Sequence, residues 1–208
     1  MKKSKRAKKS RTWVIKQHRD QFFKKSKVLG YRSRAAFKLL ELNKKFKFIK
    51  KNSNLLDIGS TPGGWSQVAS KIITKGIILA VDTTPMKKVE NVFFLNNDFL
   101  NKTTQEKIIN IFGSKIDVII SDMAENTTGN KSIDSIRTNN LCSEVINFSI
   151  ISLNKKGTLI CKLFMGEDFL EVKNLAKNNF EKVDFFKPES SRNESKETYI
   201  ICSTIKTL

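Results

Sequence analysis

Histidine and cysteine are scarce in this chain of 208 residues. His18 is the single histidine, and Cys142, Cys161 and Cys202 form no Cys-x-x-Cys pair. A Ser-His-Asp triad, Cys-His catalysis and most zinc sites are therefore excluded, and we expect no metal. An odd number of scattered cysteines is typical of reduced cytosolic thiols. Any acid–base chemistry must then come from Lys, Asp, Glu or Tyr.

Long apolar runs are also missing. No run approaches the roughly 18 residues of a membrane-spanning helix, and no apolar segment follows the basic N-terminus, as it would in a secretory signal. We therefore expect a protein that has no membrane partner. With the reduced thiols, we expect it to be cytoplasmic, and we expect a monomer. A chain of this length is expected to form one domain, or one domain with an arm.

Acidic residues are rare at the N-terminal end. The formal net charge is +19, and residues 1–51 contain 20 of the 39 Lys and Arg residues but only two acids, Asp20 and Glu41. Because the rest of the chain is nearly neutral, a general compositional bias does not explain this block. Such a block is typical of a protein that binds a polyanion, above all nucleic acid. We predict a basic, partly disordered arm over residues 1–30 and a folded domain over residues 31–208.

The hydrophobic pattern predicts strands that alternate with helices. Short apolar runs indicate strands at 54–58, 76–82, 92–96, 116–121, 158–164, 183–186 and 199–204. Helical spacing of apolar residues indicates helices over 32–48, from about 65 to 73, around 108–112, over 134–152 and over 167–179. The alternation predicts an α/β fold with a mostly parallel seven-stranded sheet and helices on both faces. Since the last two strands have no crossover helix between them, one of them is expected to be antiparallel.

The most informative segment is Asp57-Ile-Gly-Ser-Thr-Pro-Gly-Gly-Trp65. It joins a predicted buried strand to a helix, which is the ligand-binding corner of a doubly wound sheet. The segment has neither the Gly-Lys-Ser/Thr end of a Walker loop nor the G-x-G-x-x-G of a dinucleotide site. Asp57 would also meet a pyrophosphate unfavourably, whereas a cationic cofactor such as S-adenosylmethionine tolerates it. The turn therefore predicts a nucleoside-cofactor site.

Each of the first four predicted strands ends near an acidic residue, and the four are Asp57, Asp82, Asp98 and Asp122. Any one of them is as readily explained as a helix cap or a solvated loop acid. Together they are better explained by one ligand that lies across the strand ends. Asp82 is placed to bind ribose hydroxyls, and Asp98 to accept a hydrogen bond from an adenine amino group.

Lys162 interrupts an apolar run, Leu159 to Phe164, where a charge is costly unless it is paired. One interpretation places its ammonium in water at the end of the strand. The other is a desolvated lysine whose pKa is lowered, so that it can act as a general base. Glu197, just before the last predicted strand, and Lys38, on the first predicted helix, are candidate partners.

Several segments resemble the FtsJ/RrmJ-type ribosomal RNA 2′-O-ribose methyltransferases, in order from about residue 30 to the C-terminus. They are Arg32–Lys38, Asp57–Gln67, Ser121–Asn126, Lys162–Gly166 and Ser191–Glu197. The pairing of Pro-Gly-Gly-Trp with Ser-Asp-Met-Ala is the most specific part. The resemblance implies a Rossmann-like methyltransferase domain over 31–208. It also implies a catalytic set of Lys38, Asp122, Lys162 and Glu197.

The same resemblance implies that S-adenosyl-L-methionine is the cofactor. Together with the turn and the strand-end acids, it predicts a cofactor site formed by Asp57, Gly59, Gly63, Trp65, Asp82, Asp98 and Asp122. One residue departs from the family pattern, because Glu125 stands where members have proline. An extra acid at this point could alter the shape of the loop or the fit of the substrate.

The expected function is methylation of the ribose 2′-oxygen of an A-loop uridine in 23S ribosomal RNA, within the large ribosomal subunit, with Lys162 as the general base. One alternative is 2′-O-methylation of tRNA or of an mRNA cap. A second is a non-catalytic ribosome-assembly factor that binds RNA, although such a protein would not need to keep all four residues of the catalytic set. A nicotinamide-dependent oxidoreductase is disfavoured by the missing G-x-G-x-x-G.

Overall fold

The computed structural model describes residues 20–125, 128–166, 168–192 and 194–206. Its helices are α2 (Gln21–Val28), α3 (Ala35–Phe46), α4 (Gly64–Ile72), α5 (Lys102–Phe112), α6 (Lys131–Ser152) and α7 (Phe169–Asn179). Its strands are β1 (Leu55–Ile58), β2 (Ile78–Asp82), β3 (Phe93–Asn96), β4 (Ile116–Ser121), β5 (Leu153–Phe164), β6 (Phe180–Phe186) and β7 (Glu197–Ile205). The predicted arm over residues 1–30 lies largely outside the described residues, which include α2 from that region.

The seven strands form one sheet in the order β3-β2-β1-β4-β5-β7-β6. β7 runs antiparallel to both β5 and β6, and the other pairs are parallel. The predicted α/β fold, with one antiparallel strand near the C-terminus, is therefore confirmed. The order reverses between β1 and β4, because the chain first builds outward through β2 and β3 and then returns. This reversal is the switch point at which open α/β sheets bind ligands.

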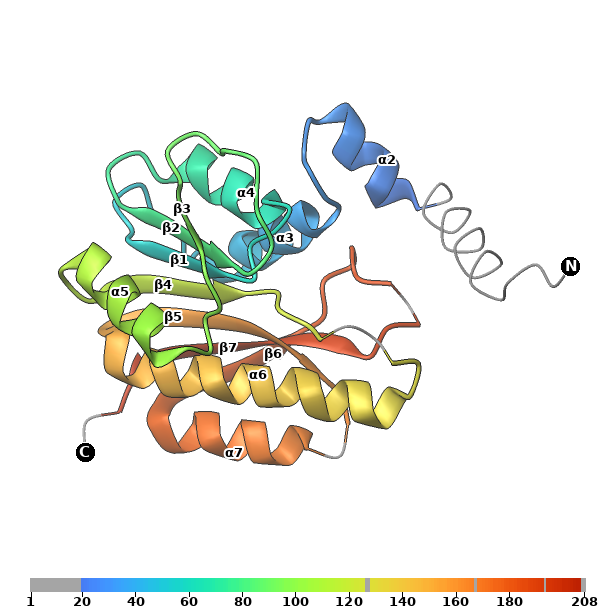
Figure 1. The fold of residues 1–208 in the computed structure, drawn as a ribbon. Coiled ribbons are helices and arrows are strands. Elements are labelled where there is room, and N and C mark those ends of the chain that lie inside the picture. Colours follow the sequence, from blue (N-terminus) through green and yellow to red (C-terminus); the bar gives the residue numbers. More distant parts are fainter. Residues whose placement is uncertain (1–19, 126–127, 167, 193, 207–208) are drawn as a thin grey trace, which may run out of the picture.

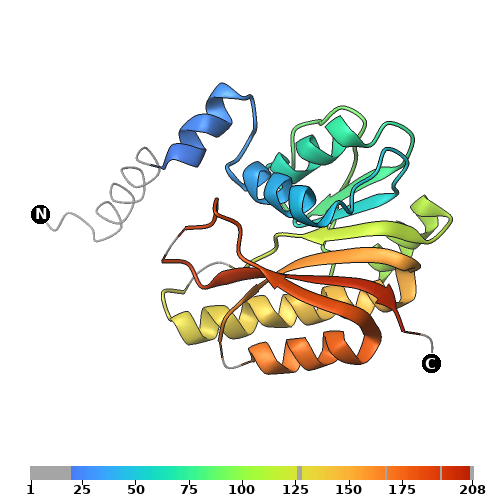
Figure 2. The same cartoon turned by 180° about the vertical axis from the view of Figure 1, so that it is seen from behind.

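Figure 1 and Figure 2 show that helices cover both faces of the sheet. α3 and α4 pack on one face, around core residues such as Leu39, Trp65 and Tyr199. α5, α6 and α7 pack on the other face. Because successive strand residues point to opposite faces, Leu163 belongs to the α6 side whereas Lys162 points toward the α3 side.

β5 begins five residues earlier than the sequence pattern predicts. Leu153 pairs with Ile116, and the register then shifts between Ile116 and Val118. The segment from 154 to 157, Asn-Lys-Lys-Gly, is polar and rich in turn-forming residues, so its composition does not indicate a strand. Pairing with β4 holds it extended against that local preference.

Two segments distant in sequence are attached to the start of α3. Asp20 caps α2 by accepting hydrogen bonds from the N–H groups of Phe22 and Phe23, and it forms an ion pair with Arg34. Arg34 also donates to the carbonyl oxygen of Ser190. The orange-red segment between β6 and β7 therefore lies beside α3, as Figure 1 shows. No helix in the described ranges is long and apolar enough to cross a membrane.

Glu41 fixes the same segment to the middle of α3. Its carboxylate accepts hydrogen bonds from the backbone N–H groups of Glu189, at 2.6 Å, and Ser190, at 3.1 Å. Each such bond to a charged group contributes about 1.5–3 kcal/mol when it is well formed. Because this segment leads directly into β7, its attachment also fixes where β7 begins.

We predict that Glu41→Ala lowers the free energy of unfolding by about 1–3 kcal/mol, since two backbone N–H groups lose a charged acceptor. Glu106→Ala, which changes an exposed acid on α5, is the matched control and should change stability by less than about 0.5 kcal/mol. Urea unfolding of both variants measures the difference. Equal stability of the two variants would contradict this role of Glu41.

Candidate active site

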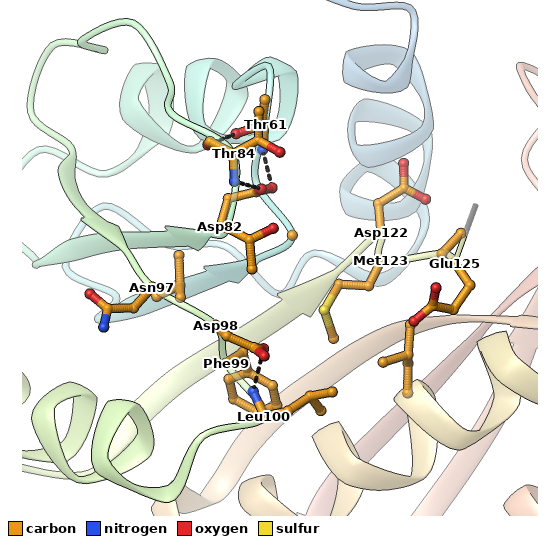
Figure 3. A pocket seen from close by; sticks show the side chains of 15 residues that line it. Thr61, Asp82, Thr84, Asn97, Asp98, Phe99, Leu100, Asp122, Met123 and Glu125 are labelled. Atoms are coloured by element: carbon orange, nitrogen blue, oxygen red, sulfur yellow. Dashed lines mark hydrogen bonds between the residues drawn. The ribbon is translucent and has the colours of Figure 1, made fainter.

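A pocket of about 480 Å³ opens at the switch point of the sheet. Its walls come from the segments that follow the carboxyl ends of β1, β2, β3 and β4, including Gly59, Asp82, Asp98 and Asp122. Figure 3 shows Asp82 and Asp98 on one side of the pocket and Asp122 and Glu125 on the other. The structure therefore brings three of the four predicted strand-end acids to one cavity.

Asp82 and Asp98 shape one side of this pocket through hydrogen bonds to the backbone. One carboxylate oxygen of Asp82 accepts from the Thr61 N–H at 2.9 Å, and the other accepts from the Thr84 N–H at 2.7 Å. Asp82 thereby ties the glycine-rich turn to the segment after β2. Asp98 accepts from the Leu100 N–H at 2.9 Å (Figure 3). Both acids are thus fixed in place before any ligand binds.

The glycine-rich turn approaches the pocket through Gly59, which has a φ of 73°. A Cβ at this position would lie 2.3 Å from Cγ of Met123, so only glycine lets the turn pass this close to the segment after β4. Gly63, with a φ of 104°, caps the N-terminus of α4. Gly63 does not line the 480 Å³ pocket.

Trp65 and Asp57 lie behind the turn rather than in the pocket. The Trp65 indole is buried against Tyr199, with ring centroids 5.7 Å apart, and its Nε1–H donates to the Ala35 carbonyl at 2.8 Å. Asp57 lies inside β1, is 1% exposed, and accepts a hydrogen bond from the Ser66 hydroxyl at 2.6 Å. Both residues support the turn from the α3 side of the sheet.

A second group of side chains adjoins the pocket, and we call Lys38, Asp122, Lys162 and Glu197 the charge cluster. Nζ of Lys38 lies 2.8 Å from Oε1 of Glu197 and 3.9 Å from Oδ1 of Asp122. Nζ of Lys162 lies 3.3 Å from Oδ1 of Asp122 and 3.8 Å from Oε2 of Glu197. Each ammonium thus faces both carboxylates, and all four predicted catalytic residues come together.

Four separate elements build the charge cluster. Lys38 comes from the buried face of α3, Asp122 follows β4, and Lys162 lies near the end of β5. In the antiparallel register, Lys162 pairs with Tyr199 and Phe164 pairs with Glu197. Because alternate residues share a face, this register places Lys162 and Glu197 on the α3 side together.

The charge cluster is largely shielded from water, with side-chain exposures between 9% and 19%. Burial alone would raise the pKa of Asp122, but Lys162, Lys38 and the hydrogen bond from Tyr199 outweigh it, and the pKa of Asp122 is lowered. In the same way, burial is outweighed by Lys38 and Lys162 at Glu197, and its pKa is also lowered. Both carboxylates therefore remain ionised at neutral pH.

Of the two interpretations of Lys162, the one that gives it a lowered pKa is wrong for this structure. Burial alone would lower the pKa, but the charges of Asp122 and Glu197 outweigh it, and the pKa of Lys162 is raised. The sequence showed the apolar strand around Lys162 but not that two carboxylates lie within 4 Å of its Nζ. In this state Lys162 carries a full positive charge, and its deprotonation requires a change in the surrounding charge.

Tyr199 is a functional candidate that the sequence interpretation missed. Its hydroxyl donates to Oδ1 of Asp122 at 2.6 Å, and its fully buried ring packs on Trp65. Burial, followed by the charges of Asp122 and Glu197, raises the pKa of Tyr199 well above its ordinary value. Tyr199 therefore stays protonated and can only donate to Asp122. Its position two residues after Glu197 in a strand is the signal that could have identified it.

The pocket beside the charge cluster is acidic. Four carboxylates line it, from Asp82, Asp98, Asp122 and Glu125, and no Lys or Arg is among the described residues in its walls. Such a lining favours a cationic ligand with hydroxyl or amino groups over a phosphate. Within the described ranges, no three His, Cys, Asp or Glu side chains lie close enough together to hold a metal ion.

The strand order, the pocket at the switch point and the adjoining charge cluster define a methyltransferase with a Rossmann-like fold. A human methyltransferase-like protein 13, solved in complex with SAH, has this fold, with a TM-score of 0.58 and 16% identity. The model of the family described as FtsJ-like methyltransferase matches residues 31–205. The chain belongs to the FtsJ-like methyltransferase family, as the sequence resemblance indicated.

Individual relatives are similar over nearly their whole length. Ribosomal RNA large subunit methyltransferase E of Pelagibacter ubique is 44% identical over 197 residues, which cover 95% of this chain and 97% of that protein. The protein of the same name from Rickettsia akari is 41% identical over 203 residues, covering 95% and 89%. A crystal structure of a Plasmodium falciparum protein, described as a ribosomal RNA methyltransferase, has a TM-score of 0.75 at 33% identity and covers 84% of this chain and 98% of its own.

The buried Asp57 should make stability depend on pH. Burial is the main cause that raises its pKa from 3.8 to about 7. Between these two values the folded protein keeps a proton that the unfolded chain has lost, so the free energy of unfolding falls as pH rises. Asp57→Asn keeps the acceptor for Ser66 and removes the titration.

We predict that the stability of Asp57→Asn relative to the wild type increases by about 2–3 kcal/mol between pH 5 and pH 8. Denaturant unfolding at both pH values measures this change, and the comparison cancels any constant cost of the amide. Glu106→Gln on the exposed face of α5 is the control and should show no such change. A difference for Asp57→Asn that is independent of pH would refute the buried titration.

Proposed function

We propose that the protein transfers a methyl group from S-adenosyl-L-methionine to the 2′-oxygen of a ribose in 23S ribosomal RNA of the large ribosomal subunit, acting in the cytoplasm as a monomer. The observation that carries the proposal is the buried charge cluster beside an acidic pocket at the switch point. The names of the relatives, ribosomal RNA large subunit methyltransferases, support the substrate. The proposed nucleotide is a uridine of the A-loop.

The pocket fits the proposed cofactor in size and in chemistry. A volume of about 480 Å³ lies within the range of roughly 300–1,000 Å³ of small-molecule sites. We assign ribose hydroxyls to Asp82 and an adenine amino group to Asp98, with Phe99, Leu100 and Met123 as apolar walls. Gly59 lets the glycine-rich turn pass close to Met123. Gly63, Trp65 and Asp57 support that turn from behind the pocket. The cofactor supplies a methyl group on a positively charged sulfonium.

Lys162 is the proposed general base. A ribose hydroxyl is a weak acid, so a base would have to take its proton as the oxygen bonds to the transferred methyl carbon, whose bond to sulfur would break to leave a neutral thioether. Asp122 lines the cofactor pocket and lies 3.3 Å from the Lys162 ammonium. A cation in the pocket competes for Asp122 and thereby lowers the pKa of Lys162. Binding of a positively charged ligand is thus the change of charge that Lys162 needs to release its proton.

The other cluster residues hold the reacting groups in place. Glu197 is fixed by Lys38 at 2.8 Å, and Asp122 is fixed by the Tyr199 hydroxyl at 2.6 Å. Lys38 and Glu197 can therefore orient the 2′-hydroxyl without moving themselves. Since alignment of reacting atoms supplies a large part of such rate accelerations, this rigidity matters as much as the proton transfer.

The charge distribution supports an RNA substrate. The excess of Lys and Arg falls in residues 1–51. The helices described in that region, α2 and α3, lie on the same side of the sheet as Lys38. We propose that residues 1–30 act as an RNA-binding arm on a methyltransferase domain over 31–208. Phosphate contacts of this kind weaken as salt increases.

We predict that the purified protein labels one A-loop ribose when it is incubated with methyl-labelled cofactor and large subunits from cells lacking this activity. Mapping of 2′-O-methyl sites measures the result, and protein-free 23S RNA should be labelled far less. Labelling of tRNA or of capped RNA in place of the subunit would overturn the proposed substrate. Cofactor binding without any labelling would favour a non-catalytic role in ribosome assembly.

Lys162→Ala should reduce methyl transfer by about 100-fold or more, which is the range for loss of a general base. Cofactor binding, measured by calorimetry, should persist. Lys156→Ala, an exposed lysine in the opposite half of β5, is the matched control and should keep full activity. In the wild type, kcat/KM, which reports the free protein, should rise with pH through the neutral and mildly alkaline range, because the pKa of Lys162 is raised there. A rate that falls with pH would rule out Lys162 as the base.

A further inference from the structure

A second cavity lies at the same edge of the sheet, and we call it the aromatic pocket. It has a volume of about 370 Å³, and its apolar walls are Met165, Phe169, Phe185 and Phe186. These residues come from the segment after β5, the first residue of α7 and the last residues of β6. The proposed cofactor and the charge cluster do not account for this cavity.

The aromatic pocket presents ring surface to solvent. The rings of Phe169 and Phe185 lie 5.0 Å apart between centroids, with planes inclined by 48°. Both side chains are only half-buried, and Met165 is 49% exposed. A solvent-open group of large apolar side chains at a cavity commonly marks a binding site.

The aromatic pocket adjoins the charge cluster directly. Glu197 lines the pocket and also forms the 2.8 Å ion pair with Lys38. The Met165 N–H donates to the Lys196 carbonyl at 3.0 Å, which ties the pocket wall to the segment before β7. An occupant of the aromatic pocket therefore lies beside Glu197, one of the four residues of the charge cluster.

Two lysines give the pocket a positive rim. Lys187 and Lys196 line it and are exposed, and the Lys187 ammonium donates to the Ser195 carbonyl at 2.6 Å. Glu197 is the one acid among the described lining residues, and Lys38 neutralises it. An aromatic floor with a cationic rim suits a planar ring that carries a phosphate.

We infer that the aromatic pocket binds an unstacked nucleobase, either that of the target nucleotide or that of its immediate neighbour, with the adjoining phosphate at Lys187 and Lys196. Sequence-specific RNA recognition commonly uses bases that leave their stack and lie on aromatic side chains. The inference rests on the proposed function. An apolar segment of a ribosomal protein is the competing occupant, but it would not require the cationic rim.

The test compares substitutions that separate stacking from apolar packing. Phe169→Leu keeps an apolar side chain but removes the ring, whereas Phe169→Tyr keeps the ring. Met165→Ala reports on the apolar wall, and Leu170→Ala, at a residue that is 61% exposed and outside the pocket, is the matched control. Initial rates of methylation at varied concentrations of large subunits give kcat and KM. Cofactor calorimetry and thermal unfolding verify that each variant is folded.

We predict that Phe169→Leu raises KM for subunits about fivefold or more, as expected for loss of one base–aromatic stack, with kcat within about twofold of the wild type. Phe169→Tyr and Leu170→Ala should keep the wild-type KM. Wild-type KM for both Phe169 variants would overturn the inference. Tolerance of Phe169→Leu together with a raised KM for Met165→Ala would instead indicate an apolar protein segment.

Direct binding of the subunits separates this inference from the proposed function. If the wild type methylates no subunit but binds it, the proposed reaction fails, and the same variants then report on the pocket through their dissociation constants. A fivefold or larger loss of affinity in Phe169→Leu alone supports the nucleobase. Equal affinities of all variants refute it.

Discussion

Asp122 is the residue on which the rest of the site depends. It lines the acidic pocket on one side and contacts Lys162 on the other, so the charges of the ligand pocket and of the charge cluster are coupled through one carboxylate. Because the cluster is shielded from water, its two lysines and two carboxylates must neutralise one another. The Tyr199 hydroxyl completes the shell of Asp122. Loss of any one of the four charged side chains leaves an uncompensated buried charge.

The sheet makes this coupling possible by its connectivity. The order of strands reverses between β1 and β4, which leaves a crevice above their carboxyl ends. Asp122 follows β4, and the adjacent β5 and β7 bring Lys162 and Glu197 to the same edge. The antiparallel direction of β7 matters, since it places the start of that strand beside the end of β5. A parallel β7 would carry Glu197 to the opposite edge of the sheet.

Negative and positive charge are concentrated in different parts of the molecule. The pocket walls carry four carboxylates, whereas the excess of positive charge falls in residues 1–51. In the proposed function, this division attracts a cationic cofactor and a polyanionic substrate to neighbouring surfaces of one chain. Lys38 belongs to both regions, because it lies in the basic segment of the sequence and in the charge cluster. The attachment of the segment before β7 to Arg34 and Glu41 links the same helix to the aromatic pocket.

The sequence by itself determined the order of the strands and of the helices from α3 onward, the glycine-rich turn and the four residues of the charge cluster, because these follow from local periodicity and from short segments shared with a family. It did not indicate the strand from 154 to 157, where pairing with β4 overrides a turn-like composition. Only the tertiary structure placed Asp57 and Trp65 behind the turn, and only the antiparallel register revealed Tyr199 at Asp122. The tertiary structure also decided the pKa of Lys162, since this pKa depends on Asp122, which follows β4, and on Glu197 in β7, 40 and 35 residues away in the chain. Electrostatic effects depend on distances in space between charged groups, and those distances are set only when the chain folds.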